Sequence, residues 1–173
     1  MNDKVTVLDV KEAYKGHNIL VTQEDIEVRG KKSRKTIVNH EDCVTIIPIQ
    51  DGKIYFVRQY RHACRRFLIE LPAGKMDKGE TPLESAQREL QEEIGMKAGE
   101  MSYLFGFYLA PGYSTEFMHL FLATELKPSK LVEDMDEQIE VLTYPLSDEA
   151  LWKPTFLDAK TIIGLNYLRD CVL

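Results

Sequence analysis

The feature that most constrains the fold is a segment at residues 81–94 in which apolar and charged side chains alternate at helical spacing. Thr81 and Glu84 form a capping-box pattern around Pro82, which suits the first turn of a helix because it has no N–H to leave unbonded. A glycine follows where a left-handed residue commonly ends a helix. We therefore expect a helix with one narrow apolar stripe. The stripe and the terminating glycine are Leu83, Ala86, Leu90, Ile94 and Gly95.

The same helix carries four charged residues whose spacing points to metal binding. An α-helix advances about 100° per residue, so Glu89 and Glu93 stand one turn apart on one face, beside the apolar stripe. Carboxylates gathered beside a core repel one another unless a cation neutralises them. Arg88 and Glu92 have the same spacing on another face, where they can form an ion pair. We predict that Glu89 and Glu93 bind a divalent cation.

The spacing around this helix resembles the Nudix box at every defined position. Gly74 is followed, after five residues, by Glu80 and then, after seven more, by Arg88-Glu89-Leu90-Gln91-Glu92-Glu93-Ile94-Gly95-Met96. The resemblance implies an α/β (α+β) fold, the Nudix-type α/β/α sandwich with a mixed β-sheet. It also implies a hydrolase of a nucleoside diphosphate linked to another group, with Mg²⁺ or Mn²⁺ as cofactor. Glu80 either supports the loop before the helix or takes a direct part in metal binding.

The resemblance extends to the individual metal ligands. It implies that Glu92 and the backbone carbonyl of Ala73 complete the site formed by Glu89 and Glu93, and that Arg88 is one of the catalytic residues. Divalent ions at such a site neutralise pyrophosphate charge and lower the pKa of a bound water that attacks phosphorus. Mg²⁺ keeps several waters, so a few carboxylates suffice to hold it.

An acidic loop, residues 133–137, precedes an expected strand at residues 139–144. Relatives often draw a general base or an additional metal ligand from a loop at this place, and Glu137 is the best match. Met135 stands where some relatives carry another glutamate. Whether Glu137 acts as base, as metal ligand or as both therefore stays open.

A second sequence pattern narrows the range of candidate substrates. Pro111 falls fifteen residues after Met96, and the tetrapeptide at residues 71–74 reads Leu-Pro-Ala-Gly. Both resemble the ADP-ribose pyrophosphatase branch of the family. That resemblance implies that Glu116, which follows the Pro111-Gly112 turn, reaches toward the terminal ribose. A plain turn is the alternative reading of the same residues.

Arginines near two expected strands are candidates for substrate binding, because a guanidinium binds phosphate with two parallel hydrogen bonds. By the same resemblance we assign Arg61 to the phosphates and Arg34, from the same or a partner subunit, to the nucleoside side. Arg58 lies on the expected strand at residues 54–60, and Arg61 directly follows that strand. Arg58 is therefore a further candidate for substrate binding. Surface arginines without such a role are the alternative.

The predicted activity is hydrolysis of the pyrophosphate bond of a nucleoside diphosphate sugar, with ADP-ribose giving AMP and ribose 5-phosphate. Another substrate of the same kind, such as GDP-mannose, is an alternative that uses the same residues. A second alternative is a regulatory module that binds ADP-ribose without cleaving it. The complete set of Glu89, Glu92 and Glu93 speaks against a pure binding module, which has no need for all three.

Composition excludes several other classes of protein. The chain has 173 residues and a net charge of −6, so we expect no nucleic-acid partner. It has no basic and apolar leader pattern and no apolar run long enough to span a bilayer, so we expect no membrane partner. The three cysteines are widely spaced and indicate reduced thiols in a cytoplasmic protein. They are Cys43, Cys64 and Cys171.

Short β-branched segments at residues 4–10, 18–28 and 34–40 predict N-terminal antiparallel strands. We expect residues 1–40 to form an element for dimerisation and substrate binding, and residues 41–173 to form the catalytic domain. An apolar strand outside the catalytic domain needs a surface to cover it. The resemblance implies a homodimer, with exchange of the strands left open. The remaining expected strands are 43–49, 54–60, 67–71, 103–109, 117–123 and 139–144, and further helices are expected at 148–153 and 158–171.

Overall fold

The computed structural model describes residues 4–16, 19–131, 138–153 and 155–171. The chain divides into two compact units. The first contains the residues up to Asp42 and the segment Tyr108–Phe117, and the second contains Cys43–Phe107 and the residues from Met118 onward. No helix within the described ranges is both long and apolar enough to cross a membrane.

The first unit contains a three-stranded sheet of order β1-β2-β3, in which both pairs are antiparallel, as predicted. Arg29 and Gly30 both have positive φ angles and make the tight turn between the second and third strands. The first strand continues to Lys15, well past its expected end at residue 10, and is exposed along its whole length. The strands are β1 (Val5–Lys15), β2 (Leu20–Val28) and β3 (Lys31–Asn39).

The second unit is built on a seven-stranded mixed sheet of order β12-β5-β4-β10-β9, in which β6 pairs with β5 and β7 pairs with β4. Strands β4 and β10 are parallel, whereas β5 is antiparallel to β4, β6 and β12. Asp51 and Gly52, both with positive φ, form the predicted hairpin turn between β4 and β5. The strands are β4 (Cys43–Gln50), β5 (Lys53–Arg61), β6 (Arg66–Glu70), β7 (Ala73–Lys75), β9 (Glu100–Tyr108), β10 (Phe117–Thr124) and β12 (Ile139–Pro145). A separate pair joins β8 (Met96–Lys97) and β11 (Lys127–Pro128).

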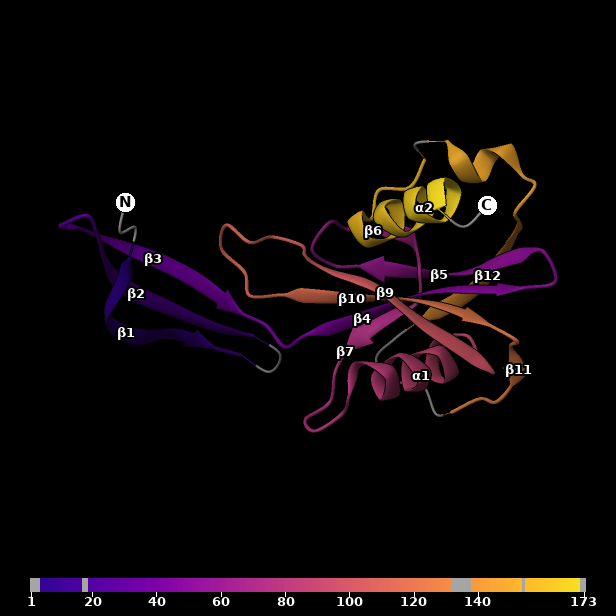
Figure 1. Cartoon of the computed structure of the whole chain (residues 1–173), viewed down its shortest axis with the longest axis horizontal. Coiled ribbons are helices and arrows are strands. Elements are labelled where there is room, and N and C mark those ends of the chain that lie inside the picture. Colours follow the sequence, from indigo (N-terminus) through magenta and orange to yellow (C-terminus); the bar gives the residue numbers. More distant parts are fainter. Residues whose placement is uncertain (1–3, 17–18, 132–137, 154, 172–173) are drawn as a thin grey trace. The chain divides into compact units, whose positions relative to one another are not determined.

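Helices α1 (Pro82–Glu93) and α2 (Ala159–Cys171) lie on opposite sides of this sheet, with the short helix η1 (Glu149–Trp152) near α2 (Figure 1). Two hydrophobic clusters fill the two interfaces. Val44 and Ile46 pack with α1 residues in one cluster, and Ile47 packs with α2 residues in the other. Because β4 supplies both clusters, its sequence is apolar on both faces. The predicted α/β/α sandwich with a mixed sheet is confirmed.

The apolar stripe of α1 differs from the prediction, and both helices bury polar side chains. Leu83 is 50% exposed, because the buried face of α1 comprises positions 85, 86, 89, 90 and 93 and lies about 90° around the helix from Leu83. Ile162 is 40% exposed, whereas Lys160 and Thr161 are buried. In both helices, polar side chains are buried at positions that a simple apolar-stripe pattern would leave exposed to solvent.

Candidate functional site

Helix α1 begins and ends where the sequence predicts. The Thr81 hydroxyl accepts a hydrogen bond from the Glu84 backbone N–H at 3.3 Å, and the Glu84 carboxylate accepts one from the Thr81 backbone N–H at 2.8 Å. Pro82 takes the first helical position, and Gly95 has a φ of 70° just past the end. The capping box fixes the start of the helix and so fixes which charged residues share a face.

Arg88 is the centre of the acidic cluster on this helix. Its guanidinium donates to the Glu80 carboxylate at 2.8 and 2.9 Å, to Glu89 at 2.7 Å and to Glu92 at 2.8 Å. A further bond, at 2.9 Å, goes to the backbone carbonyl of Lys75. The predicted ion pair between Arg88 and Glu92 is confirmed, and the contact with Glu89 is an addition to it. One arginine thus holds three carboxylates beside one another.

The charges of this cluster shift two ionisation equilibria. The hydrogen bond from Arg88 lowers the pKa of Glu80 to about 2, against a smaller opposing effect of burial and with help from the Asp77 backbone N–H. Bonding to Glu80, with the nearby charge of Glu89, raises the pKa of Arg88. Glu80 therefore stays ionised at any physiological pH and ties the loop before α1 to the helix.

The residues at the start of β7 are hydrogen-bonded to both α1 and β4. Glu93, which is 5% exposed, accepts a hydrogen bond from the backbone N–H of Ala73 at 2.8 Å. The Pro72 carbonyl accepts bonds from the Ile46 backbone N–H at 2.9 Å and from the Thr45 hydroxyl at 3.2 Å. The carboxylate of Glu93 is thereby held against the backbone at Ala73, the residue whose carbonyl is a predicted metal ligand.

Gly74 lies against the carboxylate of Glu89. A Cβ placed on Gly74 would lie 2.1 Å from the carboxyl carbon of Glu89, far inside the contact distance. Only glycine leaves room for the Glu89 carboxylate at this place, which explains the glycine at the start of the motif. Glu89 is itself 9% exposed, so the backbone and the carboxylate meet at the edge of the core.

These residues suit a hard divalent cation. Glu89, Glu92 and Glu93 offer carboxylate oxygens from one helix, and the backbone of Ala73 lies directly beside Glu93. Mg²⁺ and Mn²⁺ prefer oxygen ligands of this kind. Arg88 compensates the charge of Glu89 and Glu92 in the structure, which reduces the repulsion between these two carboxylates.

Arg61 and Arg58, both predicted to bind substrate, lie on β5 and have carboxylate partners. Arg61 donates two hydrogen bonds to Glu70, at 2.7 and 2.8 Å. Arg58 pairs with Glu140 at 2.9 Å, and its guanidinium carbon lies 4.1 Å from the centre of the Phe67 ring. Sequence analysis did not identify Glu70, although an acidic residue closing a β-strand beside the Leu-Pro-Ala-Gly segment is a visible signal.

Arg34 and Glu116 belong to the first unit. Arg34 forms a two-bond ion pair with Asp25, at 2.7 and 2.9 Å, on neighbouring strands. Glu116 closes the loop after Pro111, where its backbone carbonyl accepts a bond from Leu109 at 3.4 Å. Glu137 lies outside the described residues, and its predicted role stays a prediction.

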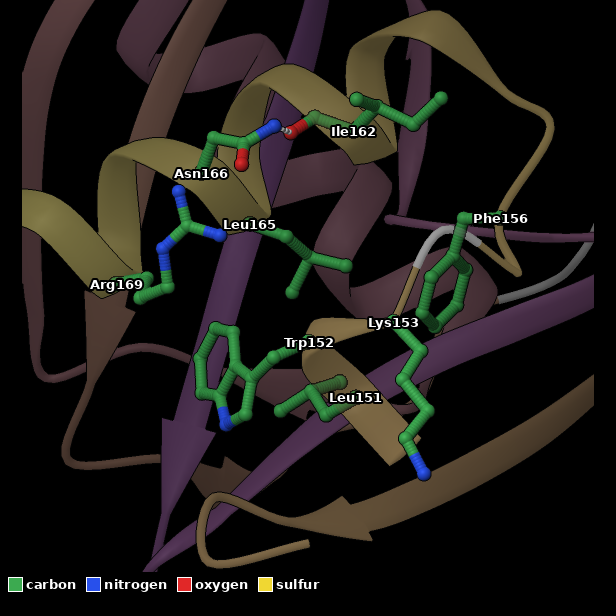
Figure 2. A pocket seen from close by; sticks show the side chains of 8 residues that line it. All are labelled: Leu151, Trp152, Lys153, Phe156, Ile162, Leu165, Asn166 and Arg169. Atoms are coloured by element: carbon green, nitrogen blue, oxygen red, sulfur yellow. Dashed lines mark hydrogen bonds between the residues drawn. The ribbon is translucent and has the colours of Figure 1, made fainter. Parts of the chain in front are cut away.

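A pocket of about 310 Å³ lies on the α2 side of the second unit and contains none of these residues. Leu165 of α2 points into it between Trp152 and Phe156 (Figure 2). The Asn166 amide at its rim donates to the Ile162 carbonyl at 2.8 Å. The pocket lies between η1 and α2, has a lining of both apolar and polar side chains, and is separate from the acidic cluster on α1.

The chain is similar to known proteins in both sequence and structure. The chain is 38% identical over 165 residues to the ADP-ribose pyrophosphatase of Bacillus subtilis (strain 168), covering 92% of this chain and 89% of that protein. It is 34% identical to the GDP-mannose pyrophosphatase of Escherichia coli O1:K1 / APEC, over 88% of this chain and 86% of that protein. A crystal structure of an ADP compounds hydrolase superposes with a TM-score of 0.86 at 27% identity, over 96% of this chain and 92% of that one.

The family comparison covers both the sheet and the acidic helix. The NUDIX domain model matches residues 39–162, which include Gly74, Glu80 and the whole charged run of α1. Since this match spans well over half of the residues and agrees with the geometry around Arg88, the chain belongs to the Nudix family.

Proposed function

We propose that the protein hydrolyses the pyrophosphate bond of a nucleoside diphosphate sugar in a reaction that requires Mg²⁺ or Mn²⁺. ADP-ribose is the preferred substrate in this proposal, and AMP and ribose 5-phosphate are the products. The observation that carries it is the set of Glu89, Glu92 and Glu93 on one helix, with Gly74 and Ala73 packed against two of them. Similarity to the B. subtilis ADP-ribose pyrophosphatase supports the choice of substrate.

A divalent ion bound at this site would neutralise negative charge on the diphosphate and lower the pKa of a bound water. The chain's own residues hold the ligands. Arg88 bonds to Glu89 and Glu92, and the Ala73 N–H bonds to Glu93, so each of the proposed ligands has a defined position beside the loop. In this proposal the Ala73 carbonyl is a further ligand, and Glu137 is a base, a ligand or both.

In this proposal four residues bind the groups of the substrate. Arg61 binds the phosphates through its guanidinium, and Arg58 adds positive charge on the same strand. Arg34 binds on the nucleoside side and Glu116 on the terminal ribose side. Arg34 lies on β3, so residues 1–40, of the same subunit or of a partner subunit, contribute to substrate binding in this proposal.

We further propose that the chain forms a cytoplasmic homodimer through residues 1–40. Strand β1 exposes a series of apolar side chains, each between 47% and 60% exposed, that a second copy would cover. These are Val5, Val7, Leu8, Val10 and Tyr14. Cys43, Cys64 and Cys171 are in the reduced thiol form, which supports the cytoplasmic location.

GDP-mannose is the second candidate substrate, favoured by the similarity to the E. coli GDP-mannose pyrophosphatase. The metal site is common to both reactions, so the choice depends on contacts to the base and the sugar. A module that binds ADP-ribose without cleavage is disfavoured by the complete carboxylate set and the glycine that makes room for Glu89.

The test is a comparison of kcat/KM for ADP-ribose, ADP-glucose and GDP-mannose with Mg²⁺, with Mn²⁺ and with excess EDTA. We expect ADP-ribose to give the highest value and EDTA to abolish turnover. A higher value for GDP-mannose would move the assignment to that substrate. A folded protein that cleaves none of the three with either metal would overturn the proposed function.

A further inference from the structure

Glu70, the last residue of β6, is a buried carboxylate bonded to cations from two separate elements. It is 1% exposed and accepts two hydrogen bonds from Arg61 of β5. Lys160 of α2, 90 positions further along the chain, donates to the same carboxylate. Burial alone would raise the pKa of Glu70, but the bonds from Arg61 and the charge of Lys160 lower it overall. Glu70 is therefore an ionised group inside the protein.

Lys160 is itself fixed in place. It is 6% exposed, although it lies in the first turn of a helix that has open surface. Its ammonium group also contacts Asp158 at 3.1 Å. Asp158 accepts bonds from the backbone N–H and the hydroxyl of Thr161, at 3.0 and 2.6 Å, and so caps the start of α2. The helix N-terminus and the lysine thus form one rigid group.

The same group is bonded to the chain leading into the metal site. The Thr161 hydroxyl accepts a hydrogen bond from the Leu71 backbone N–H at 2.8 Å. Leu71 directly follows Glu70 and lies two residues before Ala73, whose N–H bonds to Glu93. Contacts from α2 therefore meet the segment 70–73 at two consecutive residues.

We propose that Lys160 is a positioning residue for the diphosphate: it fixes Glu70, and Glu70 fixes the guanidinium of Arg61 that binds the phosphates. The inference rests on the proposed function, which assigns the phosphates to Arg61. Glu70 takes part in both contacts through the same carboxylate, so a change at Lys160 reaches Arg61 with a single side chain between them. No contact of Lys160 with substrate is required.

A purely structural ion pair makes a different prediction. Buried ion pairs are often replaceable by apolar groups with little loss of stability, so stability alone does not explain a lysine here. If Lys160 only held α2 to the sheet, its removal would lower stability. Any effect on kcat and KM would then be the same whether Arg61 is present or replaced. If it acts through Arg61, its removal raises KM for the diphosphate substrate and has no further effect once Arg61 is gone.

The experiment compares Lys160→Met, Arg61→Met and the double variant in steady-state hydrolysis of ADP-ribose with Mg²⁺. We expect Lys160→Met to raise KM about tenfold while kcat changes less than about threefold. In the Arg61→Met background the lysine substitution should leave KM unchanged. Lys153→Met, the same substitution at an exposed lysine after η1, is the matched control and should behave as wild type.

A second readout does not depend on turnover. The Nε–H proton of Arg61 is bonded to Glu70, so its NMR resonance should be resolved in the wild type and absent from Arg61→Met. We expect this resonance to shift in Lys160→Met and to keep its position in Lys153→Met. Circular dichroism melting checks that each variant is folded. Glu70→Gln, which keeps the side-chain volume, takes the place of Lys160→Met in the same comparison if that variant does not fold.

The outcomes are distinct. A shifted resonance together with a KM effect that disappears in the Arg61→Met background supports the proposal. An unshifted resonance, or an equal KM effect in both backgrounds, overturns it even if the enzyme is active. If the wild type cleaves no nucleoside diphosphate sugar, the proposed function fails, and the resonance alone decides whether Lys160 positions Arg61.

Discussion

The α-carbon of Gly74 and the carboxylate of Glu89 are so close that a Cβ on the glycine would lie 2.1 Å from the carboxyl carbon. Gly74→Ala must therefore push the Glu89 side chain away. We expect activity to fall about 100-fold or more, because a metal ligand misplaced by an ångström loses its geometry. Since the obstructing group is the end of a flexible side chain, the melting temperature should change little.

The control for this prediction is Gly112→Ala. A Cβ on Gly112 meets no atom within 4 Å. That variant should keep both the activity and the melting temperature of the wild type. Near-normal hydrolysis by Gly74→Ala would mean that Glu89 does not need its present position.

Glu93→Gln tests the metal site without changing its shape. The amide oxygen of glutamine can still accept the bond from the Ala73 N–H, so the loop should stay in place. We expect kcat to fall about 1,000-fold and the unfolding transition to stay where it is, because a neutral ligand binds Mg²⁺ poorly. Glu100→Gln, at an exposed position of β9, is the matched control. Wild-type turnover by Glu93→Gln would remove Glu93 from the catalytic residues.

Arg88→Met should make stability depend on metal. The substitution leaves Glu80, Glu89 and Glu92 without their shared cation, and we expect it to lower the free energy of unfolding by about 2–4 kcal/mol. A divalent ion can replace part of the lost charge. Millimolar Mg²⁺ should therefore raise the melting temperature of Arg88→Met more than that of the wild type in differential scanning fluorimetry. Equal shifts in the two proteins would contradict this account of the cluster.

Glu80 should contribute a pH-dependent part of the stability. Its pKa is lowered to about 2 in the folded protein, so its contribution is complete above the ordinary pKa of a glutamate. It is lost as the pH falls from about 4.5 toward about 2. We expect Glu80→Gln to cost about 1–2 kcal/mol at pH 7, since the group is partly exposed. In urea unfolding, the difference between wild type and variant should shrink between pH 5 and pH 3.5, and a constant difference would refute the assignment.

Val7→Asp should disrupt the proposed dimer. Val7 is 52% exposed on β1, and a charge there would be buried without a partner by a second copy. Sedimentation velocity at micromolar concentration should give a dimer for the wild type and a monomer for the variant. Ser102→Asp, which adds the same charge to an exposed position of β9, should remain dimeric. A monomeric wild type would remove the dimer from the proposal.

Sequence periodicity identified the longer elements because each repeats its pattern over several residues. The strand expected at 43–49 is β4, Cys43–Gln50, and the helix expected at 81–94 is α1, Pro82–Glu93. Strands β7, β8 and β11 were not predicted. With two or three residues each, they are too short to show a period, and they exist only because a neighbouring strand supplies hydrogen bonds.

The features of the candidate site that lie within helix α1 could be predicted from residue spacing alone. The burial of Glu89 and Glu93 and the pair between Arg88 and Glu92 depend only on helical geometry, so the sequence predicts them. The bond from Arg88 to Glu80 depends on how the preceding loop folds back, which spacing does not define.

The contact between Glu70 and Lys160 was beyond such reasoning. The two residues are 90 positions apart, and a lysine near the start of an amphipathic helix is normally read as solvent-exposed. Its burial results from the packing of α2 over the end of β6. That packing belongs to the tertiary structure and leaves no local pattern in the sequence.

The parallel pairing of β4 with β10 has a consequence for how the protein is made. Met118 pairs with Cys43, 75 positions earlier, so the centre of the sheet closes only after a long stretch of chain has been synthesised. Closing such a loop is entropically costly and favours slow folding. During translation, the acidic helix leaves the ribosome well before the strand that completes the sheet beneath it. We therefore expect the nascent chain to acquire its affinity for divalent ions late in synthesis.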